Sequence, residues 1–142
     1  TSAAPGTFET HAIPDFGNFV DGGVVANNPM ALAFLHLKHV MQCEDVDIRV
    51  LSLGTGKVNM TTRAGKVGRL FWARKLWPLI IDCQTRLISD AMALTLGSNL
   101  HRINPTAQPA GGLDDHRVVP ILIDLANRLD LGRTLGWLQA NW

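Results

Sequence analysis

The sequence has only two cysteines, a low charged fraction and no long apolar run. Two cysteines are too few for a disulfide framework. No stretch approaches the about 18 apolar residues of a membrane-spanning helix, because charges or prolines interrupt each candidate. A net charge of +1 argues against a nucleic acid held by bulk electrostatics. At 142 residues, 46% hydrophobic and 18% charged, the chain has the size of one globular domain rather than a disordered tail.

Positive charge is absent from the first 37 residues and concentrated in one later segment. Between Lys57 and Ile81 there are six basic residues and no acidic one. Basic side chains alternating with aromatic ones are typical of a surface that meets anionic lipid headgroups. The same pattern also arises when the aromatics pack in a core and the charges face water. The residues concerned are Arg69, Phe71, Trp72, Arg74, Lys75 and Trp77.

The order of predicted elements indicates an α/β fold. A short apolar approach leads into Asp21, and Asn27-Asn28-Pro29 is a strong helix start. Strand, turn, helix and strand in that order predict a parallel crossover unit, and hence a parallel sheet covered by helices. The predicted helices are 30–41, 78–95, one from Asp114 or Asp115 to Arg128, and 132–139; the predicted strands after the first helix are 47–53 and 99–104.

The turn Asp21-Gly22-Gly23 is the strongest single candidate for chemistry. An aspartate at the carboxyl end of a strand, before a helix, lies where α/β folds place their ligands. Glycines at such a turn let a substrate or another backbone approach closely. The alternative is an aspartate that only stabilises its own turn.

Four short motifs in order and register resemble the patatin-like phospholipase family. They are 1–5 (Thr-Ser-Ala-Ala-Pro), 19–23 (Phe-Val-Asp-Gly-Gly), 26–29 (Ala-Asn-Asn-Pro) and 51–56 (Leu-Ser-Leu-Gly-Thr-Gly). Residues 102–105 and 113–115 resemble a later strand and the start of the closing helix of that family. The resemblance covers nearly the whole chain and is most specific in residues 1–56.

The resemblance implies a three-layer α/β/α fold with a mainly parallel sheet and a lipid acyl hydrolase that uses a Ser–Asp dyad. It assigns Asp21 as the general base, with Gly22 and Gly23 shaping the turn that aims it. A serine hydroxyl is a poor nucleophile until a neighbouring base takes its proton. A carboxylate can do this without histidine if burial raises its basicity. No metal or organic cofactor is implied.

The chain departs from the family because it has no Gly-x-Ser-x-Gly elbow and no glycine-rich oxyanion loop. Its four serines, Ser2, Ser52, Ser89 and Ser98, do not lie between glycines at that spacing. Residues 1–142 therefore resemble the C-terminal portion of a single patatin-like domain, and Thr1 is expected to be a processed or cut end. The implied partners are an acyl lipid substrate, a membrane surface and the N-terminal part of the domain; a cytoplasmic or membrane-peripheral location fits them.

Two other functions stay open. One is a catalytically silent lipid-binding or regulatory fragment that uses the basic aromatic segment 63–77. The other takes Thr1 as an N-terminal nucleophile whose own amine is the base.

Three further patterns are weaker. Gly54-Thr55-Gly56-Lys57 lacks the earlier glycine of a phosphate-binding loop and is interpreted as a strand-ending turn. His36, His39 and Cys43 share a helical face but lack a second group of ligands, which favours a partly buried face. Asp114-Asp115 is interpreted as a helix cap rather than an acid/base pair.

Overall fold

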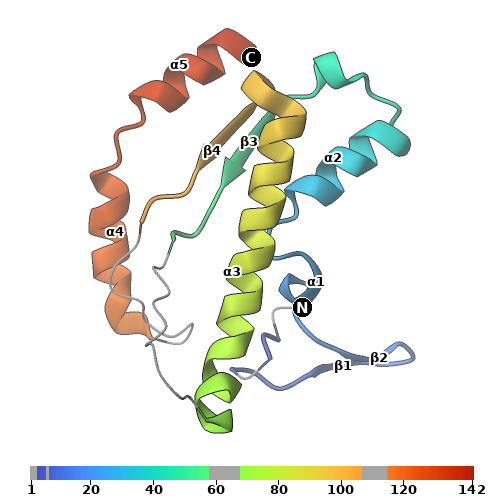
Figure 1. Cartoon of the computed structure of the whole chain (residues 1–142), viewed down its shortest axis with the longest axis vertical. Helices are drawn as coiled ribbons and strands as arrows, with labels where there is room; N and C mark the ends of the chain where they lie inside the picture. Colours follow the sequence, from blue (N-terminus) through green and yellow to red (C-terminus); the bar gives the residue numbers. More distant parts are fainter. Residues whose placement is uncertain (1–2, 6, 58–67, 107–114) are drawn as a thin grey trace.

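A computed structural model of the chain describes residues 3–5, 7–57, 68–106 and 115–142 (Figure 1). The strands are β1 (His11–Ile13), β2 (Gly17–Phe19), β3 (Val50–Leu53) and β4 (Leu100–Ile103). The helices are α1 (Gly23–Ala26), α2 (Met30–His39), α3 (Arg69–Leu96), α4 (Val119–Asn127) and α5 (Gly132–Asn141). Short 3₁₀ turns occupy Asp45–Asp47, Gly97–Asn99 and His116–Val118.

The strands β3 and β4 form a parallel pair. Val50 lies opposite Leu100 and Ser52 opposite Arg102. The long helix α3 connects the two strands and runs beside them (Figure 1). This β3–α3–β4 unit, with its parallel strands, is compatible with the predicted α/β class.

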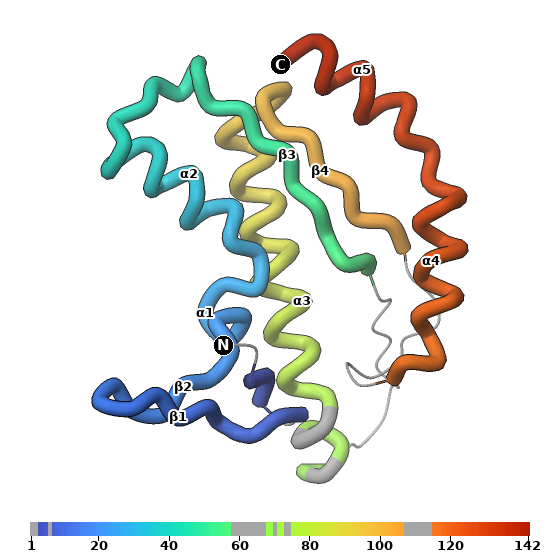
Figure 2. Tube along the Cα trace, turned by 180° about the vertical axis from the view of Figure 1, so that it is seen from behind, coloured from blue at the N-terminus to red at the C-terminus, as the bar shows by residue number. Residues whose placement is uncertain are grey.

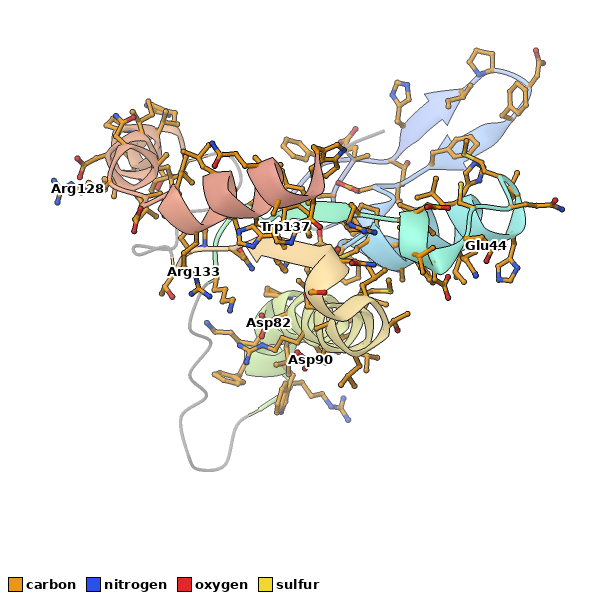
Figure 3. All side chains as sticks on the ribbon, turned by 90° about the horizontal axis from the view of Figure 1, so that it is seen from above. Glu44, Asp82, Asp90, Arg128, Arg133 and Trp137 are labelled. Atoms are coloured by element: carbon orange, nitrogen blue, oxygen red, sulfur yellow. The ribbon has the colours of Figure 1, made fainter. Side chains whose placement is uncertain are left out.

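Helices lie on both sides of this strand pair, with α3 on one side and α5 on the other (Figure 3). Successive strand side chains point to opposite faces. Val50 and Leu100 accordingly pack toward the core that α3 helps to build. His101 points the other way, stacks on Trp137 of α5 with ring centroids 5.4 Å apart, and bonds Thr134 Oγ1 at 2.9 Å. In the described residues the sheets are two separate two-stranded ones, so the larger parallel sheet of a three-layer fold stays a prediction.

The predicted crossover unit around α2 is wrong. The strand before Asp21 is β2, which pairs antiparallel with β1 and not with β3. The turn between them reverses the chain because Asp15 and Gly17 adopt left-handed φ angles of 67° and 103°. All six strand residues of the hairpin are exposed, and the hairpin lies apart from β3–β4 (Figure 2). Sequence order alone could not distinguish this hairpin from a strand of the main sheet.

Helix α2 begins as predicted, directly after Pro29. The side-chain oxygen of Asn28 accepts a hydrogen bond from the Met30 amide at 3.3 Å, which satisfies one otherwise unpaired N–H of the first turn. The helix ends at His39 rather than Met41, and Gln42 follows in a left-handed conformation with φ 56°.

Helix α3 is nine residues longer at its start than predicted, because Pro78 lies inside it rather than at its first turn. Proline removes one backbone donor from a helix interior. Here the helix continues across that gap, from Gly68 to the predicted stop at Gly97, which adopts φ 53°. The segment 69–77 is therefore helical.

The buried core is small. Its four buried members are Met30 of α2, Ile48 just before β3, and Met92 and Leu96 of α3, and each is between 3% and 7% exposed. Because Met92 and Leu96 lie at the end of α3, the core is at the amino ends of β3 and β4. The opposite, carboxyl ends of the strands are free to carry polar groups.

The cap predicted near residue 115 is confirmed for Asp115. Its carboxylate accepts from the Arg117 amide at 3.2 Å and forms an ion pair with the Arg117 guanidinium at 2.7 Å. These bonds from Arg117 hold the pKa of the Asp115 carboxyl below its usual value. Asp114 lies outside the described residues.

Candidate functional site

The Asp21 carboxylate is fixed by its own turn. Its Oδ1 accepts a hydrogen bond from the Gly23 amide at 2.7 Å, and its backbone carbonyl accepts from Val24 at 3.1 Å. The side chain is half-buried. One carboxylate oxygen thus stabilises the turn, which is the structural alternative that the sequence left open. The other carboxylate oxygen takes no part in this hydrogen bond.

Two of the motifs that carried the family resemblance meet at this turn. The Asp21 amide donates to the carbonyl of Ala3 at 3.1 Å, and Ala3 is 8% exposed. Residues 3–5 and 21–23 are therefore neighbours in space although they are separated along the chain. Thr1 and Ser2 lie outside the described residues.

The two glycines of the turn differ in their surroundings. A Cβ added at Gly23 would lie 3.1 Å from Asp21 Oδ1 and 3.3 Å from Asn27 Oδ1, so the missing side chain allows a close approach. A Cβ added at Gly22 would meet nothing within 4 Å. Gly22 has φ −60° and ψ −19°, which any residue adopts. A side chain at position 23 would therefore require Asp21 and Asn27 to shift by a few tenths of an ångström, whereas position 22 has room for one.

Two asparagines connect this turn to α3. The Asn27 side-chain amide donates to Thr85 Oγ1, and that of Asn28 donates to Ser89 Oγ, both at 3.2 Å. Asn28 is 6% exposed. The Asn-Asn-Pro motif thus starts α2 and also docks the start of that helix on the polar part of α3.

A groove of about 680 Å³ lies between α3, the start of α2 and the carboxyl ends of β3 and β4. This is the end of a parallel sheet at which α/β folds bind ligands. Asn27 and Asn28 line its edge, whereas Asp21 does not line it. Apolar side chains make up much of the lining, including Met30, Val50, Leu53, Trp77, Pro78 and Ile81.

A second groove of about 440 Å³ shares five lining residues with the first, and all the described residues that line it are polar. The shared residues are Lys57, Asp82, Thr85, Arg102 and Asn104; Arg86, Ser89 and Asp90 complete the lining. The apolar part of the larger groove therefore adjoins a polar region.

Arg102 is the central cation of the polar groove. It is half-buried on β4, and its Nη1 donates to Ser52 Oγ on β3, the residue opposite it in the register. Burial lowers the pKa of the Arg102 guanidinium below its usual value. Among the described carboxylates, none lies within ion-pair distance of it, while Asp82 is paired with Arg86 at 2.8 Å.

The turn after β3 is a structural link rather than a phosphate-binding loop. The Gly54 amide donates to the Ile103 carbonyl at 2.8 Å, and the Gly56 amide donates to Asn104 Oδ1 at 2.9 Å. A side chain at Gly54 would clash with that of Asn104. Two of the amides that such a loop would offer to phosphate are thus already bonded within the fold, which agrees with its interpretation as a strand-ending turn.

The basic aromatic segment is divided by the structure. Residues 58–67 and the side chain of Arg74 lie outside the description. Trp77 is half-buried and lines the larger groove. Trp72 is 39% exposed and packs edge-on against Phe71 with ring centroids 5.6 Å apart, while Arg69 and Lys75 are exposed.

In the described part of the chain, no helix is long and apolar enough to cross a membrane.

The described residues contain no group of three or more potential metal ligands. His36 and His39 are exposed, and Cys43 lies beyond the end of α2, partly buried against the core. Only Cys43 of the three takes part in packing, because the helix ends before it.

Sequence reasoning missed the polar groove. Ser52 is the one polar residue of β3, and Arg102 is one of the two polar residues of β4. Each lies two positions after a residue that packs against the core, and that period-two position was the available signal. Their pairing depends on the register of β3 with β4, which the sequence does not specify.

Comparison with known proteins finds a relative of this chain by sequence. The chain is 32% identical over 133 residues to a cGAMP-activated phospholipase from Pseudomonas aeruginosa (strain BWHPSA011 / Pa011). That alignment covers 91% of this chain and 40% of the relative, so the chain spans less than half of the relative's length. No protein-family model matches the chain, and no solved structure matches it significantly. The chain is thus distantly similar, over nearly all of its length, to part of a phospholipase.

Proposed function

We propose that the chain is the aspartate-bearing part of a lipid acyl hydrolase of the phospholipase A type. The observation that carries this proposal is its similarity to a phospholipase across the residues that hold Asp21 in its turn. Asp21 acts as the base of a Ser–Asp dyad and takes the proton of a serine supplied by a segment outside these 142 residues. Fatty acid release by the full-length protein and by its Asp21→Asn variant tests the proposal.

The paired grooves support a lipid as the substrate. An acyl chain fits the apolar lining around Trp77 and Ile81, and a polar headgroup fits the adjoining groove. Asn27 lines the larger groove, and its Oδ1 and Asp21 Oδ1 both lie close to Gly23. The proposed base is therefore beside the edge of the lipid site.

The two glycines of the turn give a matched test of the proposed base. We expect Gly23→Ala to lower hydrolysis by the full-length protein more than Gly22→Ala does, because only the former places a methyl group against the Asp21 carboxylate. Initial rates and thermal unfolding are measured for both variants. Equal rates would contradict the view that the position of this carboxylate limits catalysis.

We propose further that the exposed face of α3 contacts the membrane. Trp72, Leu76 and Ile80 follow one another at four-residue spacing and are 39%, 49% and 38% exposed. Arg69 and Lys75 are exposed at the same end of the helix. Apolar anchors beside cations fit an anionic lipid interface. A catalytically silent lipid-binding protein would use the same surface, and it differs only in lacking hydrolysis.

Replacing Arg69 and Lys75 with Gln should weaken binding to anionic vesicles about tenfold or more, since each cation near such a surface contributes about 1 kcal/mol. Hydrolysis of a small soluble ester should be unaffected. Trp72→Ala should also weaken vesicle binding and cost little stability, whereas Trp77→Ala should mainly reduce stability. Vesicle sedimentation and thermal unfolding distinguish these effects. Unchanged vesicle binding in both the charge variant and Trp72→Ala would remove α3 from the membrane interface.

A further inference from the structure

We propose that the polar groove binds the phosphate group of the ligand, with Arg102 and Lys57 as its cations. The proposal specifies the headgroup chemistry of the lipid and rests on the proposed function for the lipid source of that phosphate. Phosphate binding itself is measured without hydrolysis, so the two proposals can fail separately.

The geometry of Arg102 is the first argument. Its guanidinium has five N–H donors, and Nη1 donates to Ser52 Oγ. The hydroxyl is neutral, so the bond does not balance the charge. A half-buried guanidinium with no carboxylate partner among the described residues lacks the compensation that buried cations normally have. A bound anion supplies it, and the planar fork of arginine fits two phosphate oxygens at once.

The rest of the lining is the second argument. Lys57 lines the same groove from the turn after β3, and Thr85 lines it from α3, whereas the Ser89 hydroxyl already donates to the Thr85 carbonyl at 2.7 Å. Cations, hydroxyls and a side-chain amide are the groups that bind phosphate in proteins that do not use a glycine-rich loop. This agrees with the turn itself, whose Gly54 and Gly56 amides are already bonded within the fold.

The acidic residues of the groove allow a test in which two charge variants should change phosphate affinity in opposite directions. Asp82 is neutralised by Arg86, and Asp90 is exposed without an ion-pair partner among the described residues. Figure 3 shows that both carboxylates come from α3. Asp90 repels a bound phosphate, so removing its charge should strengthen binding, whereas removing Lys57's charge should weaken it.

The experiment titrates the full-length protein with glycerol 3-phosphate by calorimetry, and in parallel with vesicles that contain phosphatidylglycerol. We expect Lys57→Gln to weaken binding about fivefold and Asp90→Asn to strengthen it by a similar factor. Arg102→Lys keeps the charge and loses the fork, which should cost about tenfold. The control is Arg128→Gln, which removes one positive charge from an exposed residue directly after α4; Arg128 pairs with Asp124 and points away from α3 (Figure 3).

Binding of the soluble ester with this pattern of variants supports a site that accepts free phosphate esters. The same pattern with vesicles only supports a lipid-borne phosphate. Lys57 and Asp90 are both exposed, so these two variants decide the question even if the Arg102 variant does not fold. The proposal is overturned if neither probe binds, or if Lys57→Gln and Asp90→Asn change binding no more than Arg128→Gln does.

Discussion

Hydrolysis of an acyl ester by the full-length protein should fall by about 10²–10⁴-fold when Asp21 is replaced by Asn. Asparagine has nearly the same shape, and its side-chain oxygen can still accept the hydrogen bond from the Gly23 amide. The turn should therefore persist, while the group that accepts the serine proton is lost. Steady-state rates on a phospholipid and on a small soluble ester measure the effect.

Two controls make this result specific. Asp115→Asn removes a carboxylate that caps the turn before α4, outside both grooves, and should leave the rate near that of the wild type. The thermal unfolding curve of Asp21→Asn should also overlay that of the wild type. A rate near the wild-type value in Asp21→Asn, with folding intact, would show that Asp21 serves only its own turn.

The pH dependence of the Asp115 cap has a definite sign. Because its pKa is lowered in the folded protein, the cap contributes stability above the ordinary pKa of an aspartate. That contribution is lost as the pH falls through the lower, folded-state value. Thermal unfolding of the wild type and of Asp115→Asn should therefore converge at acidic pH.

The sequence predicted those elements whose boundaries depend on local chemistry. Pro29 and Asn28 specify the start of α2, and the left-handed Gly97 specifies the end of α3, because these residues act within a few positions of themselves. The predicted start of α3 was wrong because Pro78 is tolerated inside the helix, where it removes one backbone donor without ending the helix.

The candidate site was predictable only in part, for a similar reason. Asp21 and Gly23 are close in sequence, so their turn could be recognised from residue types alone. The polar groove instead depends on side chains from β3, β4 and α3, which are brought together by strand register. Long-range pairing of this kind is set by the whole fold, and no local motif encodes it.

The second large effect is expected in the core, where Leu96→Ala should lower the free energy of unfolding by about 2–5 kcal/mol. Leu96 is 7% exposed and packs with Met92, Met30 and Ile48 in a core that has only these four buried members among the described residues. Each removed methyl group therefore leaves a cavity that few neighbours can fill. Because domains are stable by only about 5–15 kcal/mol, this loss is a large share of the total.

The matched control for this substitution lies two residues earlier on the same helix. Leu94 is 89% exposed, so Leu94→Ala removes the same atoms from water-facing surface and should change stability by less than about 0.5 kcal/mol. Both variants replace leucine with alanine in the same helix, so the change in helix propensity is the same. The two substitutions therefore differ in the burial of the side chain that is removed. Urea unfolding of the two variants measures it. Similar midpoints would place Leu96 outside the core and would contradict the packing of α3 against α2 and β3.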